Sequence, residues 1–327
     1  MRNSFGKRFA ALGLAVLLPF LTAATWGDKE LDSLDFSDRT DYKLPIDLSV
    51  VDPHAVESAY TETSYEDSTI RVNIETKRFE DRCDYWVADI VIADPSQLRT
   101  ASASGNFLRS AEMDGVALCS LLNAVVGLNG DFTFGVEKKG FGYYVRQGAL
   151  YKDNLDTDDH WHAKLMDVLI IDEDGDFHIV HLAKKGDIEN MRYNGKRILN
   201  SLCFGPALVR DGKGVEDFEH ADWWLNMAFE NERSRIAFCQ AGPLHYKVIC
   251  CSGPYRSGTG YDLRPNSGLT LLDFARLCAR EDVQTAYNLD GGDSAMLYFH
   301  GDRINGRPNK SVRKLQDVIY FVSAEGL

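Results

Sequence analysis

Short strand-like segments separated by glycine turns constrain the fold of this chain more than any other feature. Two pairs of such segments flank a turn: residues 168–171 with 177–180, around Asp174-Gly175, and residues 235–239 with 247–251, around Gly242-Pro243. β-Rich runs on either side of such a turn are typical of a β-hairpin. Further strands are expected at residues 70–74, 85–93, 285–289, 295–299 and 317–323.

Two helices are expected among these strands. In residues 270–281 the apolar side chains recur at helical spacing, at Leu271, Phe274, Ala275 and Cys278. Thr270 and Asp273 form a capping box at the start of this helix, and residues 110–123 form the second one. Because strands outnumber helices, the sequence predicts an α+β fold: a single domain with a large mixed β-sheet and a few packed helices.

The first 24 residues differ from the rest. Arg2, Lys7 and Arg8 precede an apolar run at 9–21, and small residues follow it. This order is typical of a secretory signal peptide, and the run is short for a membrane span. We therefore expect residues 1–24 to be removed on export to the cell surface or the medium, and we expect no stable membrane insertion afterwards. An uncleaved membrane anchor is the alternative. Residues 25–65 are then a linker and extended lead-in, and residues 66–327 form the main domain.

The charge of the chain excludes one class of partner. Its net charge is −13 at pH 7, whereas binding to a nucleic acid backbone requires clustered Lys and Arg. A small phosphorylated ligand is not excluded, because one local arginine can hold a phosphate on an acidic protein.

The seven cysteines carry no metal-binding or redox pattern. Their number is odd, and no two have C-x-x-C spacing. Several lie in apolar runs, where a thiol acts as a small hydrophobe. We expect mostly free, buried cysteines, with one disulfide possible.

Two segments share an arrangement that suits a binding cleft. In each, an apolar strand reaches Asn and then Asp beside Gly, at Asn129-Gly130-Asp131 and at Asn288-Leu289-Asp290-Gly291-Gly292. Glycine allows a sharp turn and a close approach of ligand to backbone. The alternative is a pair of tight turns in which Asn and Asp cap their own backbone. The presence of both segments, with Arg235 on a strand between them, favours a site.

The second segment also resembles a known signature. Residues 288–294 resemble the N-L-D-G-G-G-S signature of the phosphodiester glycosidase family, which includes the lysosomal uncovering enzyme. Further segments match that family in order: Asn129-Gly130-Asp131-Phe132, residues 204–212, residues 233–237 and residues 267–275. The resemblance spans roughly residues 66–323 and suggests a bacterial secreted member. It departs from the family at Asp293, in place of a third glycine, and at Thr133, in place of an aromatic residue.

The resemblance implies a hydrolase that cleaves the glycosidic bond of a sugar-1-phosphodiester. We expect neither a metal nor a cofactor, because no set of His or Cys residues has ligand spacing. Arg235 would hold two phosphate oxygens. Asp290 or Asp131 would face the developing oxocarbenium ion, and which of them does so stays open. The expected substrate-binding residues are Asn129, Gly130, Asn288, Gly291, Gly292, Asp293, Ser294 and Arg256. By family order Arg256 and Arg313 either reach phosphate or lie on the surface.

Two alternatives remain at this level. In the first, the protein binds carbohydrate without turnover, because the change at Asp293 has removed activity. In the second, the protein is a glycosidase that acts on polymer linkages without phosphate.

Overall fold

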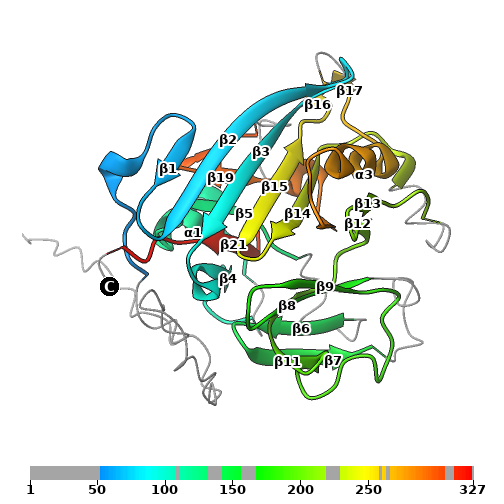
Figure 1. Cartoon of the computed structure of the whole chain (residues 1–327). Coiled ribbons are helices and arrows are strands. Elements are labelled where there is room, and N and C mark those ends of the chain that lie inside the picture. Colours follow the sequence, from blue (N-terminus) through cyan, green and yellow to red (C-terminus); the bar gives the residue numbers. More distant parts are fainter. Residues whose placement is uncertain are drawn as a thin grey trace, which may run out of the picture.

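The computed structural model describes residues 52–107, 111–131, 142–155, 167–218, 229–257, 260–262, 266–305 and 313–325. Its strands form two packed sheets and a smaller lobe, and a helix lies on the outer face of each packed sheet (Figure 1). The expected export signal and most of the expected linker lie outside the described residues.

The larger sheet has eight strands in the order β1-β2-β3-β15-β14-β18-β12-β13. Their bounds are Ser64–Glu66 (β1), Ile70–Phe79 (β2), Cys83–Ile92 (β3), Ala207–Arg210 (β12), Lys213–Gly214 (β13), Arg235–Gly242 (β14), His245–Cys251 (β15) and Thr285–Leu289 (β18). Every neighbouring pair is antiparallel.

The smaller sheet has five strands in the order β20-β19-β5-β21-β4 and packs face to face against the larger one. Its strands are Leu98–Ser102 (β4), Val126–Asn129 (β5), Leu297–Phe299 (β19), Asp302–Arg303 (β20) and Asp317–Phe321 (β21). The main core lies between the sheets: Ile90 and Phe238 of the larger sheet belong to the same buried cluster as Leu128 and Ile319 of the smaller one. Burial of each such side chain stabilises the fold by roughly 1.5–3 kcal/mol.

Within the described residues, one helix covers the outer face of each sheet. α3 (Leu271–Ala279) lies on the larger sheet, with Phe274 and Cys278 buried against its strands. Its N-cap is Thr270, whose side chain accepts a hydrogen bond from Asp273 N at 3.1 Å. α1 (Gly115–Leu121) covers the smaller sheet, with Leu118 and Cys119 buried.

A separate lobe lies below the sandwich in Figure 1. It holds a sheet in the order β10-β11-β8-β9 and the hairpin β6-β7, around its own core. Its strands are Gly142–Arg146 (β6), Ala149–Asn154 (β7), Val168–Asp172 (β8), Phe177–Val180 (β9), Arg192–Tyr193 (β10) and Lys196–Leu202 (β11). Elsewhere in the chain, a separate hairpin joins Tyr255–Ser257 (β16) to Gly260–Asp262 (β17). Single 3-10 turns occur at Glu57–Ala59 (η1), Pro95–Gln97 (η2) and Gly292–Ser294 (η4).

The expected hairpins and the helix α3 are confirmed. β8 pairs with β9, β14 with β15, and residues 285–289 form β18. The second expected helix is shorter than residues 110–123 and spans Gly115–Leu121.

The prediction of a mixed sheet is wrong, because the described strand pairs are antiparallel. After β15 the chain passes through α3 and enters β18, which runs in the same direction as β15. However, β14 lies between β15 and β18, so each strand meets an antiparallel neighbour. A crossover therefore exists here without a parallel pair.

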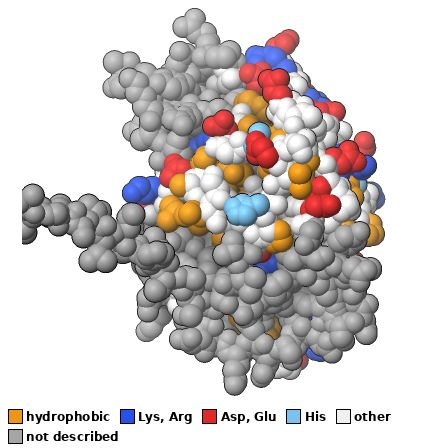
Figure 2. All heavy atoms as spheres, turned by 90° about the vertical axis from the view of Figure 1, so that its left-hand side faces the viewer, with side chains coloured by type: hydrophobic (Ala, Val, Ile, Leu, Met, Phe, Trp, Pro, Cys, Tyr) orange, Lys and Arg blue, Asp and Glu red, His pale blue; other side chains and the backbone are white. Residues whose placement is uncertain are grey.

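The cysteines agree with the sequence analysis. All seven cysteines are buried and free. Within the described ranges, no helix is long and apolar enough to cross a membrane. Figure 2 shows a face on which apolar side chains are scattered among charged ones. Of the residues with described burial, Val56 and Leu121 are the exposed large apolar ones.

Candidate active site

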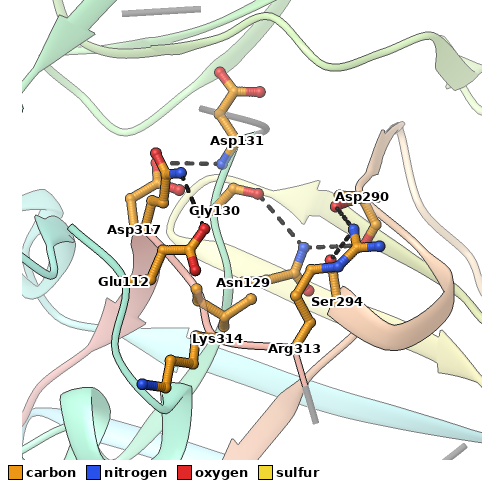
Figure 3. Close-up of a pocket in the computed structure, with 11 residues that line it drawn as sticks. Glu112, Asn129, Gly130, Asp131, Asp290, Ser294, Arg313, Lys314 and Asp317 are labelled. Atoms are coloured by element: carbon orange, nitrogen blue, oxygen red, sulfur yellow. Dashed lines mark hydrogen bonds and ion pairs between the residues drawn. The ribbon is translucent and has the colours of Figure 1, made fainter. Parts of the chain in front are cut away.

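Four chain segments meet around one pocket of about 290 Å³. They are the segment before α1, the end of β5, the segment after β18 and the residues that lead into β21, so both sheets of the sandwich contribute (Figure 3). The pocket is lined by Glu112, Asn129, Gly130, Asp131, Asp290, Ser294, Arg313, Lys314, Leu315, Gln316 and Asp317. The structure thus brings the two segments predicted from the sequence to one site.

One end of the pocket combines a carboxylate with a cation. Arg313 Nη1 lies 3.3 Å from Asp290 Oδ2 and donates to Ser294 Oγ at 3.0 Å. The side chain of Asp290 is 20% exposed and that of Arg313 is 53% exposed, so both can meet a ligand. Burial raises the pKa of Asp290, while its hydrogen bond with Ser294 and the charge of Arg313 oppose that shift.

The turn after β18 needs both of its glycines. A Cβ on Gly291 would lie 2.6 Å from the carbonyl oxygen of Ser234, which no side chain tolerates. Gly292 has a φ of +60° and donates its N–H to the same carbonyl at 2.8 Å. The turn therefore docks on the chain just before β14 and fixes Asp290 at the pocket. Asp293 follows on η4 and is partly buried.

Asn129 joins the two sheets beneath the pocket. Its Nδ2 donates to the carbonyl oxygen of Asp290 at 3.1 Å, and its Oδ1 accepts from Met296 N at 3.0 Å. The side chain is 2% exposed. Because the amide is engaged by backbone groups at both ends, its main contribution is to hold β5 against the segment after β18.

The other end of the pocket holds two buried carboxyl groups on one guanidinium. Arg146 Nη2 lies 3.3 Å from Asp131 Oδ2 and 3.5 Å from Asp317 Oδ2. Asp131 Oδ2 also accepts from Cys203 N at 2.7 Å, and Asp131 N donates to Asp317 Oδ2 at 3.3 Å. Asp131 Oδ1 is buried and has no hydrogen-bond partner among the described residues.

Burial sets the protonation of this pair. It raises the pKa of Asp131, against the opposing charge of Arg146. For Asp317, burial and the charge of Asp131 raise the pKa to about 7, although Arg146 opposes this. Two close carboxylates cannot both ionise cheaply out of water.

Gly130 makes this arrangement possible. A Cβ at this position would lie 2.4 Å from Asp317 Cγ. Glycine is therefore required for the approach of the Asp317 carboxyl to β5, rather than for an unusual φ. The N–H of Gly130 also donates to the carbonyl oxygen of Asp317 at 3.0 Å.

Five predicted site residues do not line the pocket within the described part of the chain: Arg235, Asn288, Gly291, Gly292 and Asp293. The Nη2 of Arg235 donates to Asn231 O at 2.7 Å and its Nε to Leu269 O at 3.2 Å. Burial lowers its pKa to about 10. Asn288 is buried in β18 and donates to Gly205 O at 2.8 Å. Arg256 lies on β16, and its side chain is outside the described residues.

Sequence reasoning missed Asp317 and Arg146. Both carried a usable signal, because each is a charged residue at the edge of an apolar strand, in Asp317–Phe321 and Gly142–Arg146. A charge that a strand carries into the interior must find a partner. Arg313, which was expected to reach either phosphate or the surface, lies in the pocket.

The described residues show no metal centre. Within those ranges, no three His, Cys, Asp or Glu side chains are grouped so that they could hold an ion.

The family model for phosphodiester glycosidase matches residues 122–322. The match covers more than half of the chain, and the chain therefore belongs to the phosphodiester glycosidase family, a family of glycosidase-type hydrolases. A search of curated proteins gave no match.

Solved structures share the fold at low sequence identity. The catalytic domain of zebrafish N-acetylglucosamine-1-phosphodiester alpha-N-acetylglucosaminidase aligns with a TM-score of 0.57 and 14% identity, over 84% of this chain and 89% of that one. A hypothetical protein from Synechocystis aligns with a TM-score of 0.50 and 14% identity, over 78% of this chain and 62% of that one.

Proposed function

We propose that this protein is an exported hydrolase that cleaves the glycosidic bond of a sugar-1-phosphodiester. The observation that carries the proposal is the placement of Asp290 beside Arg313 in one pocket, with both side chains accessible. The family supports a phosphodiester glycosidase in general, and the zebrafish relative is named for an N-acetylglucosamine-1-phosphodiester.

The bond to be broken explains this pairing. A phosphate monoester leaves as an anion, so fixed positive charge at the leaving group lowers the barrier. Arg313 provides that charge through a planar fork that suits two phosphate oxygens. Arg235, the arginine that the sequence favoured, uses two of its donors on backbone carbonyls. We therefore assign the phosphate contact to Arg313 and a supporting role to Arg235.

Asp290 is the carboxylate that we assign to the anomeric carbon. Its side chain is more accessible than that of Asp131, which is only 1% exposed. In the reaction the bond from the anomeric carbon to the phosphate oxygen breaks, and its electron pair stays on the phosphate. Water adds its oxygen to the anomeric carbon, and Asp290 either accepts the water proton or first forms the covalent bond that water then replaces.

A comparison of two arginine variants tests the phosphate assignment. Arg313→Lys keeps the charge but loses the fork, so it should slow hydrolysis of a sugar-1-phosphodiester at least tenfold more than that of an activated aryl glycoside, whose leaving group carries no phosphate. Arg235→Lys serves as the matched control and should affect both substrates equally. Selective loss in Arg235→Lys, with none in Arg313→Lys, would return the phosphate contact to Arg235.

A screen of wild-type protein across sugar-1-phosphodiesters and aryl glycosides tests the function itself. Release of a phosphate monoester supports the proposal. Sugar binding without any release would identify a carbohydrate-binding protein. Turnover confined to linkages without phosphate would identify a different glycosidase.

The proposal of export rests on the order of charged, apolar and small residues at positions 1–24. We expect the mature chain to begin near Thr25. N-terminal sequencing of protein from the medium or cell surface tests this, and an intact Met1 on soluble cytoplasmic protein would contradict it.

A further inference from the structure

Two acidic groups of different character line the same pocket. Figure 3 shows Asp290 with Arg313 and Ser294 on one side, Asp131 and Asp317 on the other, and Asn129 between them. Hydrolysis of a glycoside commonly uses two carboxyl groups, one of which is ionised while the other is protonated. The environments of the two ends supply a physical reason for that division.

The end of the pocket that holds Asp131 and Asp317 has fewer cationic groups than carboxyl groups. Asp131 and Asp317 share Arg146, whose side chain is 2% exposed, so two carboxylates would face one guanidinium out of water. One bound proton makes the three groups neutral together. The proton is therefore retained for a structural reason: without it, one negative charge is buried unpaired.

Within the described part of the chain, Arg146 is the cation that contacts this pair. Lys152 lies over the ring of Tyr144, with its Nζ 5.5 Å from the ring centroid, and burial lowers its pKa. The phenols of Tyr144 and Tyr287 and the thiol of Cys203 face the pair, and burial raises the pKa of each well above neutrality, so they stay uncharged. The other charged groups that line the pocket are Glu112, Asp290, Arg313 and Lys314. Arg313 is engaged by Asp290, and Lys314 is exposed.

The two carboxyl groups are distinguishable by their contacts. Asp131 Oδ2 accepts from Cys203 N and from Arg146, which favours its ionised form. The carboxyl group of Asp317 lies against the backbone of Gly130, and burial together with the negative charge of Asp131 raises its pKa. Asp317 is thus the member that holds the proton, and Asp131 Oδ1, buried and without a partner among the described residues, is left to accept a hydrogen bond from a ligand.

We propose that Asp317 is the general acid of the hydrolysis: paired with ionised Asp131 and held by Arg146, it keeps a proton at neutral pH and gives it to the oxygen that leaves the sugar. This inference rests on the proposed function. As the bond from the anomeric carbon breaks, its electrons pass to the leaving oxygen and the proton of Asp317 joins that oxygen. The water that supplies the new sugar hydroxyl releases one proton, which restores Asp317 through solvent. Arg146 is a positioning residue.

The pH profile of Asp317→Asn tests the assignment. The amide keeps the size of the side chain and an acceptor for Asp131 N, but it cannot donate the proton. Wild-type activity should fall as pH rises through about 7, because the acid loses its proton there. In Asp317→Asn this alkaline limb should disappear and kcat should drop on the order of 100-fold. An aryl glycoside whose phenol is more acidic than a phosphate monoester, whose second pKa is about 6, should lose less, since its leaving group needs the proton less.

Asp172→Asn is the matched control. Asp172 is also buried, paired with Lys196 and hydrogen-bonded to His178, but it lies in the lobe away from the pocket. This variant should keep the alkaline limb. If Asp317→Asn keeps both the limb and the rate, the acid role is overturned.

A measurement without substrate separates the two proposals. Infrared spectra of the wild-type protein should show the C=O band of a protonated carboxyl that is lost on raising the pH through about 7. Absence of that band in wild type, even if Asp317→Asn does not fold, overturns the inference. If wild type hydrolyses no substrate, the proposed function and the acid role both fail. Wild-type turnover with an unchanged Asp317→Asn profile defeats the acid role alone.

Discussion

Gly130→Ala tests whether the close approach of Asp317 to β5 matters for activity. The added Cβ would lie 2.4 Å from Asp317 Cγ and 2.5 and 2.6 Å from its two oxygens. Ordinary contacts between carbon atoms are about 3.5–4.0 Å, so the carboxyl must withdraw by roughly 1 Å. Its distances to Arg146 Nη2 and Asp131 N are already 3.5 and 3.3 Å, and a shift of that size breaks both contacts.

The expected magnitudes follow from this displacement. Overpacking of a buried site costs about 1–3 kcal/mol of unfolding free energy. Misplacement of a reacting group by about 1 Å costs on the order of 100-fold in rate. Denaturant unfolding measures the first quantity, and kcat on a sugar-1-phosphodiester across pH measures the second.

Gly242→Ala is the control for the substitution itself. A Cβ there meets nothing within 4 Å, and the residue does not have a left-handed φ. It should change stability by less than about 0.5 kcal/mol and leave the rate unchanged. A folded Gly130→Ala protein with the wild-type rate and the wild-type alkaline limb would refute the reasoning.

Three further predictions concern the same pocket. Asp290→Asn keeps the shape but removes the negative charge, so kcat should fall about a thousandfold, roughly 4 kcal/mol of barrier, with a modest change in KM; near-full activity would place the catalytic carboxylate elsewhere. Activity should persist in chelator, since no described cluster holds an ion; loss restored by one specific ion would contradict this. The unfolding free energy should fall between about pH 4 and 7, because folded Asp317 binds a proton that the unfolded chain releases. The slope is at most about 1.4 kcal/mol per pH unit for one proton, and Asp317→Asn should flatten it in a pH series of unfolding curves.

The pattern of strands and turns was readable in the sequence, because it is a local property. Residues 285–289 lead into the Gly291-Gly292 turn, and they form β18 as expected. The spacing of Leu271, Phe274 and Cys278 likewise placed α3. The order of strands is not local, and the sequence offered no means to see that β14 would separate β15 from β18.

The site was readable in part for the same reason. Asp290 and Asp131 stand beside glycines in recognisable segments, and both line the pocket. Arg235 also stood in a matching segment, but its burial and its contacts with backbone carbonyls depend on tertiary packing. Asp317 lies 186 positions from Asp131, so the carboxyl pair exists only once the sheets are assembled.

The position of bond cleavage tests the central claim most directly. Wild-type protein and a sugar-1-phosphodiester are incubated in ¹⁸O-labelled water, and both products are analysed by mass spectrometry. A glycosidase breaks the bond between the anomeric carbon and oxygen, so the label should enter the sugar and the phosphate monoester should stay unlabelled. Label in the phosphate would show attack at phosphorus instead and would contradict the account.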